Sequence, residues 1–366
     1  MGMWFEQFDF ESDPYERLDP YLIREKYIDW DRPDLQEVRH SLNRFVENVC
    51  NQRRVGLKVF GPSGGGKTWF VRLCQKEISK KQPTSIFVYT KIPEIEPTFQ
   101  VVYRIGIEYF LDSQMTLLID HVTKTKQSTS LEAWKEIIDD PNLSVCFAKI
   151  SGGGEAAVSA RRWLIGDKLS SAELKSIEIV TSLDSDYDRF VTLKKLLKQL
   201  SRIFSTAVLI VDELENASVK PARQLGDSLR DMLDEFGERF ALLCCFTAEK
   251  EEEWYDLGYT EALARRLDFT VKLDSLKIDT LPEFLRLHHR LYRKRKSEVK
   301  DQIFPFTEDG IRELLNQMDP SLHYPGYFLP NCGELARLAA LKRLSEINAG
   351  FVKSNISLVP HIRLPR

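Results

Sequence analysis

A glycine-rich loop near the start of the chain has the residue types and spacing of a phosphate cradle. Residues 61–68 read GPSGGGKT and fit the pattern G-x-x-x-x-G-K-[ST]. The backbone N–H groups of such a loop can surround phosphate oxygens, and glycines permit this because they carry no Cβ. We therefore predict that a nucleotide binds through Gly61, Pro62, Ser63, Gly64, Gly65, Gly66, Lys67, Thr68 and Trp69.

The lysine and the threonine that close this loop suit a nucleoside triphosphate with a metal ion. Lys67 would neutralise the β and γ phosphates, so it is also a candidate catalytic residue. The hydroxyl of Thr68 would take one position around Mg²⁺. The predicted cofactors are therefore ATP and Mg²⁺.

Acidic residues end a buried apolar run much later in the chain. In VLIVDELE (208–215), apolar residues lead directly into Asp212 and Glu213. A carboxylate at the end of a buried strand is costly unless a partner holds it, so we predict that Asp212 binds Mg²⁺ directly or through its second shell. Glu213 would polarise the attacking water. In the alternative, both acids only cap the next helix. Glu215 is either a solvated surface acid or a further acid of the metal site.

Polar residues at the next strand end and before the last strand complete the candidate catalytic set. Thr247 follows an apolar run and would hold the attacking water or the γ phosphate, or else be an ordinary strand-end threonine. Arg265 and Arg266 precede the last apolar run. One of them would reach the γ phosphate of a neighbouring subunit as an arginine finger, unless both form surface salt bridges.

These residues must be positioned by a sheet, and apolar segments predict its strands. Strands alternating with helical segments indicate an α/β fold with a parallel sheet covered on both faces, in which the Thr247 strand lies beside the acidic one. Helical spacing also predicts a helix over 34–52 with Asp34 as its N-cap. The predicted strands are 55–60, 85–90, 207–215, 239–249 and 268–273.

The spacing of the motifs predicts how the domains are arranged. Lys67 and Asp212 are much further apart than two βαβ units of roughly 30 residues each require, so we expect a helical insert around 110–190. Gly152 to Gly154 lie within this region, lack the GK[ST] of a second cradle and are expected to form a hinge before a small helical insert. The predicted parts are a lead-in (1–30), a P-loop domain (31–275) and a helical lid subdomain (276–366).

Composition indicates a globular protein whose net charge does not favour binding to nucleic acid. The net charge is −3, so a basic binding surface must be local. The six cysteines show no C-x-x-C pair, which favours reduced thiols. The start of the chain lacks the basic-then-apolar pattern of a signal peptide, and no apolar run is long enough for a membrane span. We expect a cytoplasmic protein without a membrane partner.

Taken together, these motifs resemble an AAA+ ATPase over about residues 30 to 350. They are GPSGGGKT, VLIVDELE, Thr247 after a strand, ARR before the last strand and a helical C-terminal region. Within that class the chain resembles the branch with the origin-recognition, TniB-type and ExeA-type ATPases, and MWFEQFDFESDPY is similar to the lead-in of the last group. The resemblance implies a five-stranded parallel sheet of AAA+ type with a C-terminal lid.

A second, local resemblance involves the insert. The stretch ARRWLIGDKLSSAEL, followed by a helix and then VLIVDELENAS, is similar to the P-loop ATPases of BREX-type phage-defence systems. Those ATPases carry a W-L-x-G-[DE]-x-L-[ST] segment before an aspartate-glutamate strand. This resemblance implies a role in genome defence with partner proteins of a multi-component system.

The AAA+ resemblance also implies contacts in the lid and between subunits. A lid arginine should contact the nucleotide from a G-[DN]-x-R segment, and here NCGELAR offers Arg337 with one residue too many after Gly333. ATP-dependent self-association is implied as well. The basic stretch 286–300 would contact DNA phosphates, or else form the solvated face of a lid helix.

The sequence therefore predicts an ATP-hydrolysing AAA+ ATPase that switches an assembly. We expect it to act on DNA, in genome defence or in mobile-element or replication biology. The alternative is a STAND-like scaffold whose nucleotide state controls protein contacts with little turnover. The intact pair Asp212 and Glu213 favours hydrolysis.

Overall fold

The computed structural model of the chain describes residues 3–16, 35–36, 38–95, 98–294, 297, 299, 303–359 and 362. These residues form two compact units. One unit, here called the sheet unit, comprises residues 43–60 and 77–271. The other, the lid unit, comprises the described residues of 1–42, together with 61–76 and 272–366. The predicted N-cap Asp34 lies outside the described residues.

Five parallel strands form one sheet in the order β2-β3-β4-β1-β5. The registers run from Ser85 opposite Thr206 in the β2/β3 pair and from Ala207 opposite Phe240 in the β3/β4 pair. The predicted five-stranded sheet is therefore confirmed, including the neighbouring position of the acidic strand and the Thr247 strand. The strands are β1 (Val55–Gly61), β2 (Ser85–Lys91), β3 (Thr206–Asp212), β4 (Phe240–Thr247) and β5 (Phe269–Lys272).

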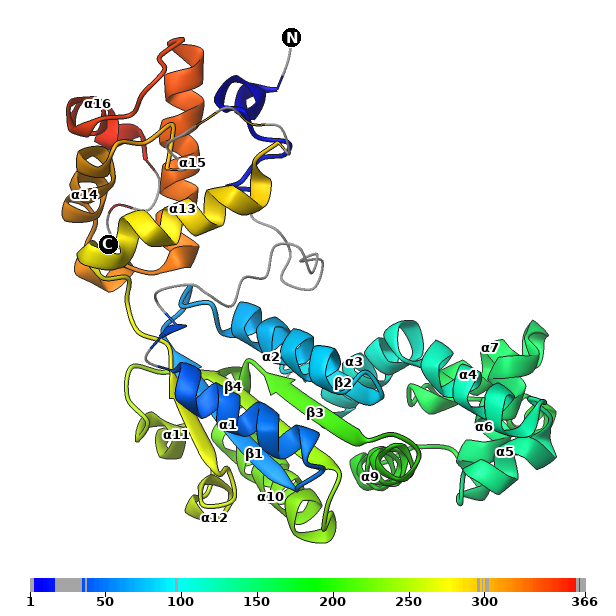
Figure 1. Cartoon of the computed structure of the whole chain (residues 1–366). Helices are drawn as coiled ribbons and strands as arrows, with labels where there is room; N and C mark the ends of the chain where they lie inside the picture. The colour runs from blue at the N-terminus through cyan, green and yellow to red at the C-terminus, as the bar shows by residue number, and fades with distance from the viewer. Residues whose placement is uncertain are drawn as a thin grey trace. The chain divides into compact units, whose positions relative to one another are not determined.

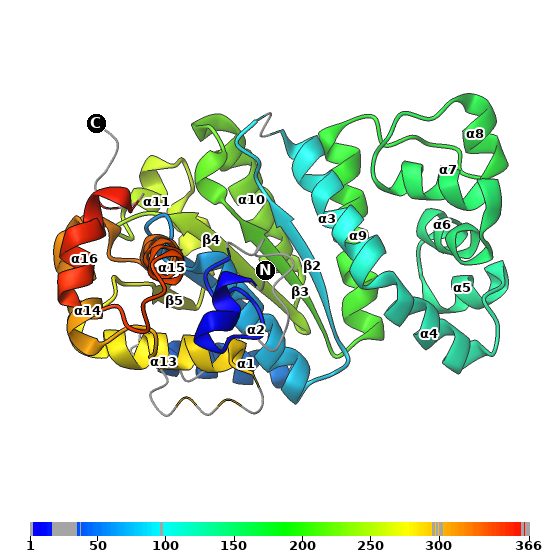
Figure 2. The ribbon, with the colours of Figure 1, turned by 90° about the horizontal axis from the view of Figure 1, so that it is seen from above.

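Helices cover the sheet on both faces, which explains why its central strands are buried and apolar at most positions. Every residue of β3 is buried. One face packs against α3 (Phe99–Ser113), α9 (Asp186–Ile203) and α10 (Val219–Glu235), which are drawn around the strands in Figures 1 and 2. On the other side, α1 (Arg39–Cys50) is tied to the sheet, because the Thr206 hydroxyl donates to the Val49 carbonyl at 3.1 Å.

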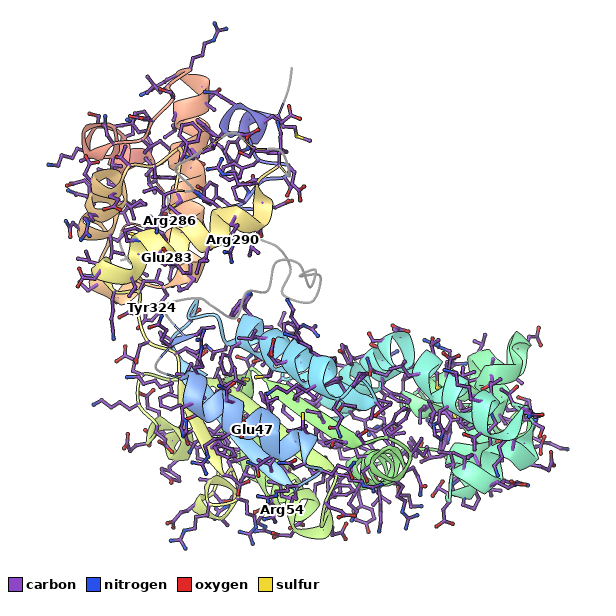
Figure 3. All side chains as sticks on the ribbon, in the orientation of Figure 1. Glu47, Arg54, Glu283, Arg286, Arg290 and Tyr324 are labelled. Atoms are coloured by element: carbon purple, nitrogen blue, oxygen red, sulfur yellow. The ribbon has the colours of Figure 1, made fainter. Side chains whose placement is uncertain are left out.

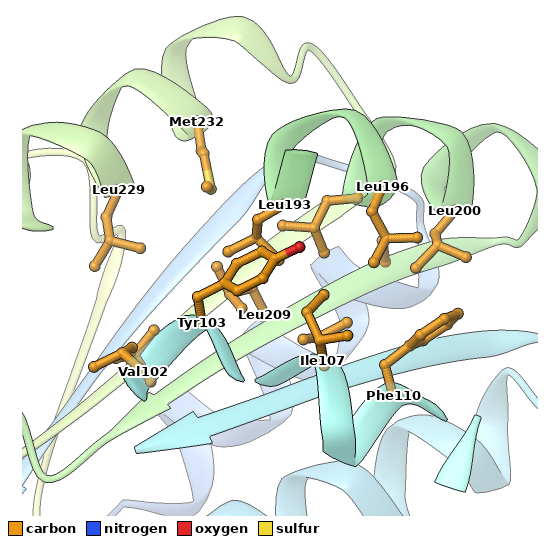
Figure 4. Close-up of a cluster of buried hydrophobic side chains, with 14 of the residues drawn as sticks. Val102, Tyr103, Ile107, Phe110, Leu193, Leu196, Leu200, Leu209, Leu229 and Met232 are labelled. Atoms are coloured by element: carbon orange, nitrogen blue, oxygen red, sulfur yellow. The ribbon is translucent and has the colours of Figure 1, made fainter. Parts of the chain in front are cut away.

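The contact between α3, α9 and the sheet forms the centre of the larger core. Figure 4 shows Tyr103 and Ile107 of α3 gathered with Leu193 and Leu196 of α9 around Leu209 of β3. Each fully buried aliphatic side chain of this kind contributes roughly 1.5–3 kcal/mol relative to exposure. The two helices that connect the insert to the sheet are thereby fixed on it.

The region between α3 and α9 is helical, which confirms the predicted insert. In Figure 2 its helices lie alongside α3 and α9, on the side away from the strands. Gly153 and Gly154 lie inside the insert as the tight turn between two packed helices, with φ of 71° and 75°. The hinge predicted before a small helical insert therefore corresponds to a turn that has a packed helix on each side, and its positive φ values explain the glycines. The insert helices are α4 (Met115–Lys126), α5 (Leu131–Ile137), α6 (Pro141–Gly152), α7 (Gly154–Leu164) and α8 (Ser171–Ser176).

The W-L-I-G-D segment has a structural explanation within this insert. Trp163 is buried and its indole N–H donates to the Thr181 carbonyl at 2.8 Å. Asp167 lies 3.1 Å from the Arg104 guanidinium of α3. Gly166 has φ of 82°, and an added Cβ would lie 3.0 Å from Nε of Arg189. The segment that carries the BREX resemblance thus fastens α7 to its neighbours.

The lid unit is helical around a second core, as predicted for the C-terminal region. The N-terminal residues also belong to this core, since Phe8 and Phe10 are fully buried in it, with the Phe8 ring 5.9 Å from Phe304 and the Phe10 ring 5.0 Å from His289. Residues 3–16, the described part of the lead-in, therefore belong to the lid unit rather than to a separate segment. The lid helices are α13 (Leu281–Tyr292), α14 (Glu308–Gln317), α15 (Pro325–Leu341) and α16 (Ala349–Asn355), preceded by the 3-10 turn Trp4–Phe8.

Three further helices complete the described chain. They are α2 (Lys67–Lys81), which follows the glycine loop, and the short α11 (Glu253–Asp256) and α12 (Glu261–Ala264), which connect β4 to β5. Across the ranges that the structure describes, no helix combines the length and the apolar character needed to cross a bilayer.

Candidate functional site

The glycine loop has the backbone shape that its sequence predicts. It begins where β1 ends at Gly61 and closes where α2 begins at Lys67. Gly64 and Gly66 have φ of 74° and 92°, which side chains with a Cβ rarely adopt. Nothing lies within 4 Å of the position that a Cβ on Gly66 would take, so the backbone there faces open space.

Lys67 lies folded against this loop. Its Nζ donates to the carbonyl oxygens of Gly61 and Pro62, at 3.0 Å each, and the residue is 9% exposed. A buried ammonium beside the N-terminus of a fifteen-residue helix is a strong attraction for phosphate. The loop from Gly61 to Lys67 therefore has a shape and a charge that suit the phosphates of a nucleotide, and the role of Thr68 toward Mg²⁺ stays a prediction.

The first turn of α15 contacts the glycine loop inside the lid unit. The Gly326 amide donates to the Gly64 carbonyl at 2.9 Å. A Cβ on Gly326 would lie 2.7 Å from Cα of Gly64, and one on Gly64 would lie 2.9 Å from the Tyr327 ring. Both glycines are thus needed for the contact. Figure 3 labels Tyr324, the residue that precedes α15.

Sequence reasoning missed this contact. The available signal was the pair Pro325 and Gly326 at the start of a helix, since proline is favoured in the first turn and glycine permits close backbone approach. Nothing in the pattern named Gly64 as the partner.

In the sheet unit, the carboxylate of Asp212 is held at the end of β3. It is 1% exposed. Its Oδ2 accepts from the Tyr89 hydroxyl at 2.9 Å, and its Oδ1 accepts from the Glu213 amide at 2.9 Å. Neither acid caps α10, whose N-cap is Ser218, so the helix-capping alternative receives no support. The buried carboxylate is of the kind that suits Mg²⁺.

Glu213 has an unusual backbone for a residue with a side chain. Its φ of 58° and ψ of 40° are left-handed, a conformation often found where function requires strain. Burial raises the pKa of its carboxyl group, and Asp212 and Glu215 nearby raise it further. The Lys91 ammonium, 3.9 Å away, opposes this by lowering the pKa. A carboxylate with a raised pKa is a better proton acceptor.

This balance leads to a pH prediction. Replacing Lys91 by methionine removes the cation, so the pKa of Glu213 should rise further. A base works only when deprotonated, and the acidic limb of a kcat–pH profile for ATP hydrolysis should move to higher pH. Lys91→Arg keeps the charge and serves as the control. Overlapping profiles for all three proteins would show that Lys91 does not tune the Glu213 carboxylate.

Thr247 ends β4 and contacts the turn that follows β3. Its hydroxyl donates to Oε1 of Glu215. Glu215 is therefore not a freely solvated surface acid, one of the two roles considered for it. The parallel β3/β4 pairing explains the contact, because it places the carboxyl ends of both strands at one edge of the sheet.

The two candidate finger arginines differ sharply in their surroundings. The Arg265 side chain is 73% exposed and pairs only with Glu261, one helical turn away, among the described residues. The Arg266 guanidinium donates to Asp234 at 2.5 Å and to the Ala262 carbonyl at 2.9 Å. The hydrogen bond to Asp234 raises the pKa of Arg266. Arg266 is thus held within its own unit, whereas Arg265 is available to a neighbour.

Arg337 lies on α15 and contacts the N-terminal segment. Its guanidinium is 3.1 Å from Asp13 and lies over the Trp4 ring at 5.5 Å. It also approaches Glu334 at 3.6 Å. The extra residue between Gly333 and Arg337 is consistent with the contact of Arg337 with the N-terminal segment. Gly333 allows this segment to pack closely, because a Cβ on Gly333 would lie 2.6 Å from Cβ of Tyr15. Nucleotide contact by Arg337 remains a prediction.

The basic stretch 286–300 holds the lead-in on the lid. Arg293 donates to the carbonyls of Phe8 and Phe304 and lies 4.1 Å above the Phe10 ring. Arg286, labelled with Arg290 on α13 in Figure 3, pairs with Glu283. Residues 295, 296, 298 and 300 lie outside the described part. The described contacts favour a structural role, so DNA binding here has no support from them.

Comparison with known proteins identifies the fold. No protein-family model matches the sequence, and no curated protein matches it either. Among solved structures, Cdc6p from Pyrobaculum aerophilum matches with a TM-score of 0.55 at 12% identity, over 95% of this chain and 73% of that one. The ORC2 protein of Aeropyrum pernix matches with a TM-score of 0.52 at 10% identity, over 93% and 73%. The local similarity to BREX-type ATPases stays a prediction. The chain has the α/β fold of AAA+ type that these two structures share.

Proposed function

We propose that this protein binds ATP with Mg²⁺ and hydrolyses it to switch an assembly. The observation that carries the proposal is the acidic turn after β3, where buried Asp212 adjoins Glu213 in a left-handed conformation. A nucleotide-binding scaffold has no need to hold a base in a strained backbone. The ammonium of Lys67 and the open glycine loop supply the phosphate site.

Each residue has a chemical role in this proposal. The loop amides and the Lys67 ammonium bind the β and γ phosphates. Bound Mg²⁺, held by Thr68 and Asp212, would neutralise charge on the phosphates. Glu213 accepts a proton from the attacking water at its carboxylate. The Tyr89 hydroxyl keeps the Asp212 carboxylate oriented.

The assembly that is switched is also proposed. We infer that ATP promotes self-association, which the exposed Arg265 supports, and that the protein works with partners on DNA in genome defence or in mobile-element or replication biology. The origin-recognition type of fold and the sequence resemblances support this destination. If duplex DNA at low salt neither binds nor changes the ATPase rate, while a partner protein does, the DNA role should be abandoned.

Removal of the loop ammonium tests nucleotide binding directly. Lys67→Ala should weaken the binding of a fluorescent ATP analogue by roughly 10- to 150-fold, since a charge-assisted hydrogen bond contributes about 1.5–3 kcal/mol. Lys81→Ala, at the exposed end of the same helix, is the matched control and should bind as wild type. Equal affinities for all three proteins would contradict the assigned phosphate site.

A further inference from the structure

We propose that Glu215 is a positioning residue, which fixes the Thr247 hydroxyl so that it accepts a hydrogen bond from the attacking water. This inference rests on the proposed ATPase function. Of the two roles considered for Thr247, it favours holding the attacking water over binding the γ phosphate. It also assigns a role to Glu215, which is neither the predicted base nor the predicted Mg²⁺ ligand.

The turn that carries Glu215 is held in place on both sides of this residue. On one side of it, the side-chain amide of Asn216 donates to the Ile92 carbonyl at 2.8 Å. On the other side, the Leu214 carbonyl accepts from the Tyr259 hydroxyl at 2.9 Å. Both neighbours of Glu215 are thus hydrogen-bonded to separate segments, one that follows β2 and one between α11 and α12. The Glu215 carboxylate therefore contacts Thr247 from a turn that hydrogen bonds hold in place.

The hydrogen bond between Thr247 and Glu215 limits what the threonine hydroxyl can still do. A threonine hydroxyl has one proton to donate and two lone pairs that accept. Thr247 donates its proton to Oε1 of Glu215. The hydroxyl then has only accepting capacity left, so it can receive an O–H of water but cannot donate to a phosphate oxygen.

The other carboxylate oxygen of Glu215 is also able to accept a hydrogen bond. Oε2 of Glu215 is buried and has no hydrogen-bond partner in the structure as far as it is described. A buried acceptor is costly unless it is satisfied, commonly by an ordered water. Glu215 and Thr247 therefore offer adjacent acceptors for water at the edge of the sheet where Glu213 also lies.

Four variants test the roles of Glu215 and Thr247, with kcat for ATP hydrolysis measured separately from the affinities for ATP and ADP. Thr247→Val should lower kcat by about 10²-fold through misplaced water and leave the affinity ratio of ATP to ADP unchanged. Thr247→Ser keeps the hydroxyl and should retain most turnover. Glu215→Ala should lower kcat in the same direction. Glu215→Gln keeps an acceptor oxygen for the hydroxyl and should restore much of the rate.

A double variant and a control variant show whether these effects are specific to the Glu215–Thr247 pair. The double variant with Thr247→Val and Glu215→Ala should be no slower than Thr247→Val alone, because the two residues act as one unit. Glu249→Gln, an exposed acid beside Thr247 in the chain, is the matched control and should behave as wild type. Thermal unfolding of each variant shows whether the loss is merely structural.

The contrary outcomes are distinct. A selective loss of ATP over ADP affinity in Thr247→Val would assign the hydroxyl to the phosphate and overturn the inference. Glu215→Gln as slow as Glu215→Ala would make Glu215 a base or metal ligand instead, and undiminished turnover in Glu215→Ala would remove its role. Failure of the wild type to bind or hydrolyse ATP would instead refute the proposed function itself.

Discussion

Glu213→Gln is expected to lower ATP turnover by roughly 10²- to 10⁴-fold while ATP binding persists, as loss of a general base requires. The amide is nearly isosteric with the carboxylate but cannot accept the proton of the attacking water. The left-handed backbone at Glu213 and the raised pKa of its carboxyl group both indicate a residue held for proton transfer. Steady-state phosphate release gives kcat, and a fluorescent ATP analogue gives the affinity.

The control for this change is Glu252→Gln, an exposed acid in the connection after β4, which should retain wild-type turnover. If Glu213→Gln hydrolyses ATP as fast as wild type, the base has been assigned wrongly. If the wild type binds ATP tightly but shows almost no turnover, the STAND-like scaffold is the better interpretation. The acidic turn would then hold nucleotide without completing its hydrolysis.

The sheet was predictable because its signals are local. Runs such as Ala207 to Val211 are apolar at every position, which is typical of strands covered on both faces, and polar residues mark their ends. The glycine loop was predictable for the same reason, since its pattern, strand and helix are contiguous. The acids of the candidate site followed from the cost of a charge at a buried strand end.

The remaining features depend on contacts between distant segments. The N-terminal aromatics do not reveal from their own spacing that Phe8 and Phe10 complete the lid core. A basic helix looks alike whether its charges meet phosphate or backbone carbonyls, so Arg293 could not be separated from a DNA ligand. The bond from Thr247 to Glu215 likewise requires knowledge of which strands are neighbours.

Arg265→Ala is expected to lower the ATPase rate of the assembled protein by about 10³- to 10⁵-fold, as loss of an arginine finger does. Arg265 lies on the surface in an i,i+4 pair with Glu261, and such exposed pairs break readily. Arg266→Ala should leave catalysis largely intact, because that guanidinium is engaged with Asp234 in its own subunit. Mass photometry with and without ATP establishes whether both variants still assemble.

A mixing experiment then separates action in trans from action within one chain. Glu213→Gln subunits carry an intact Arg265, and Arg265→Ala subunits carry an intact Glu213. If the finger acts across the interface, mixed oligomers form sites in which the first variant supplies the arginine and the second the base, so activity returns on mixing two inactive proteins. Mixtures that stay inactive, although mass photometry shows that the subunits co-assemble, would exclude Arg265 as a finger. The exposure of Arg265 would then reflect only a solvated surface at α12, and subunit coupling would need another cation.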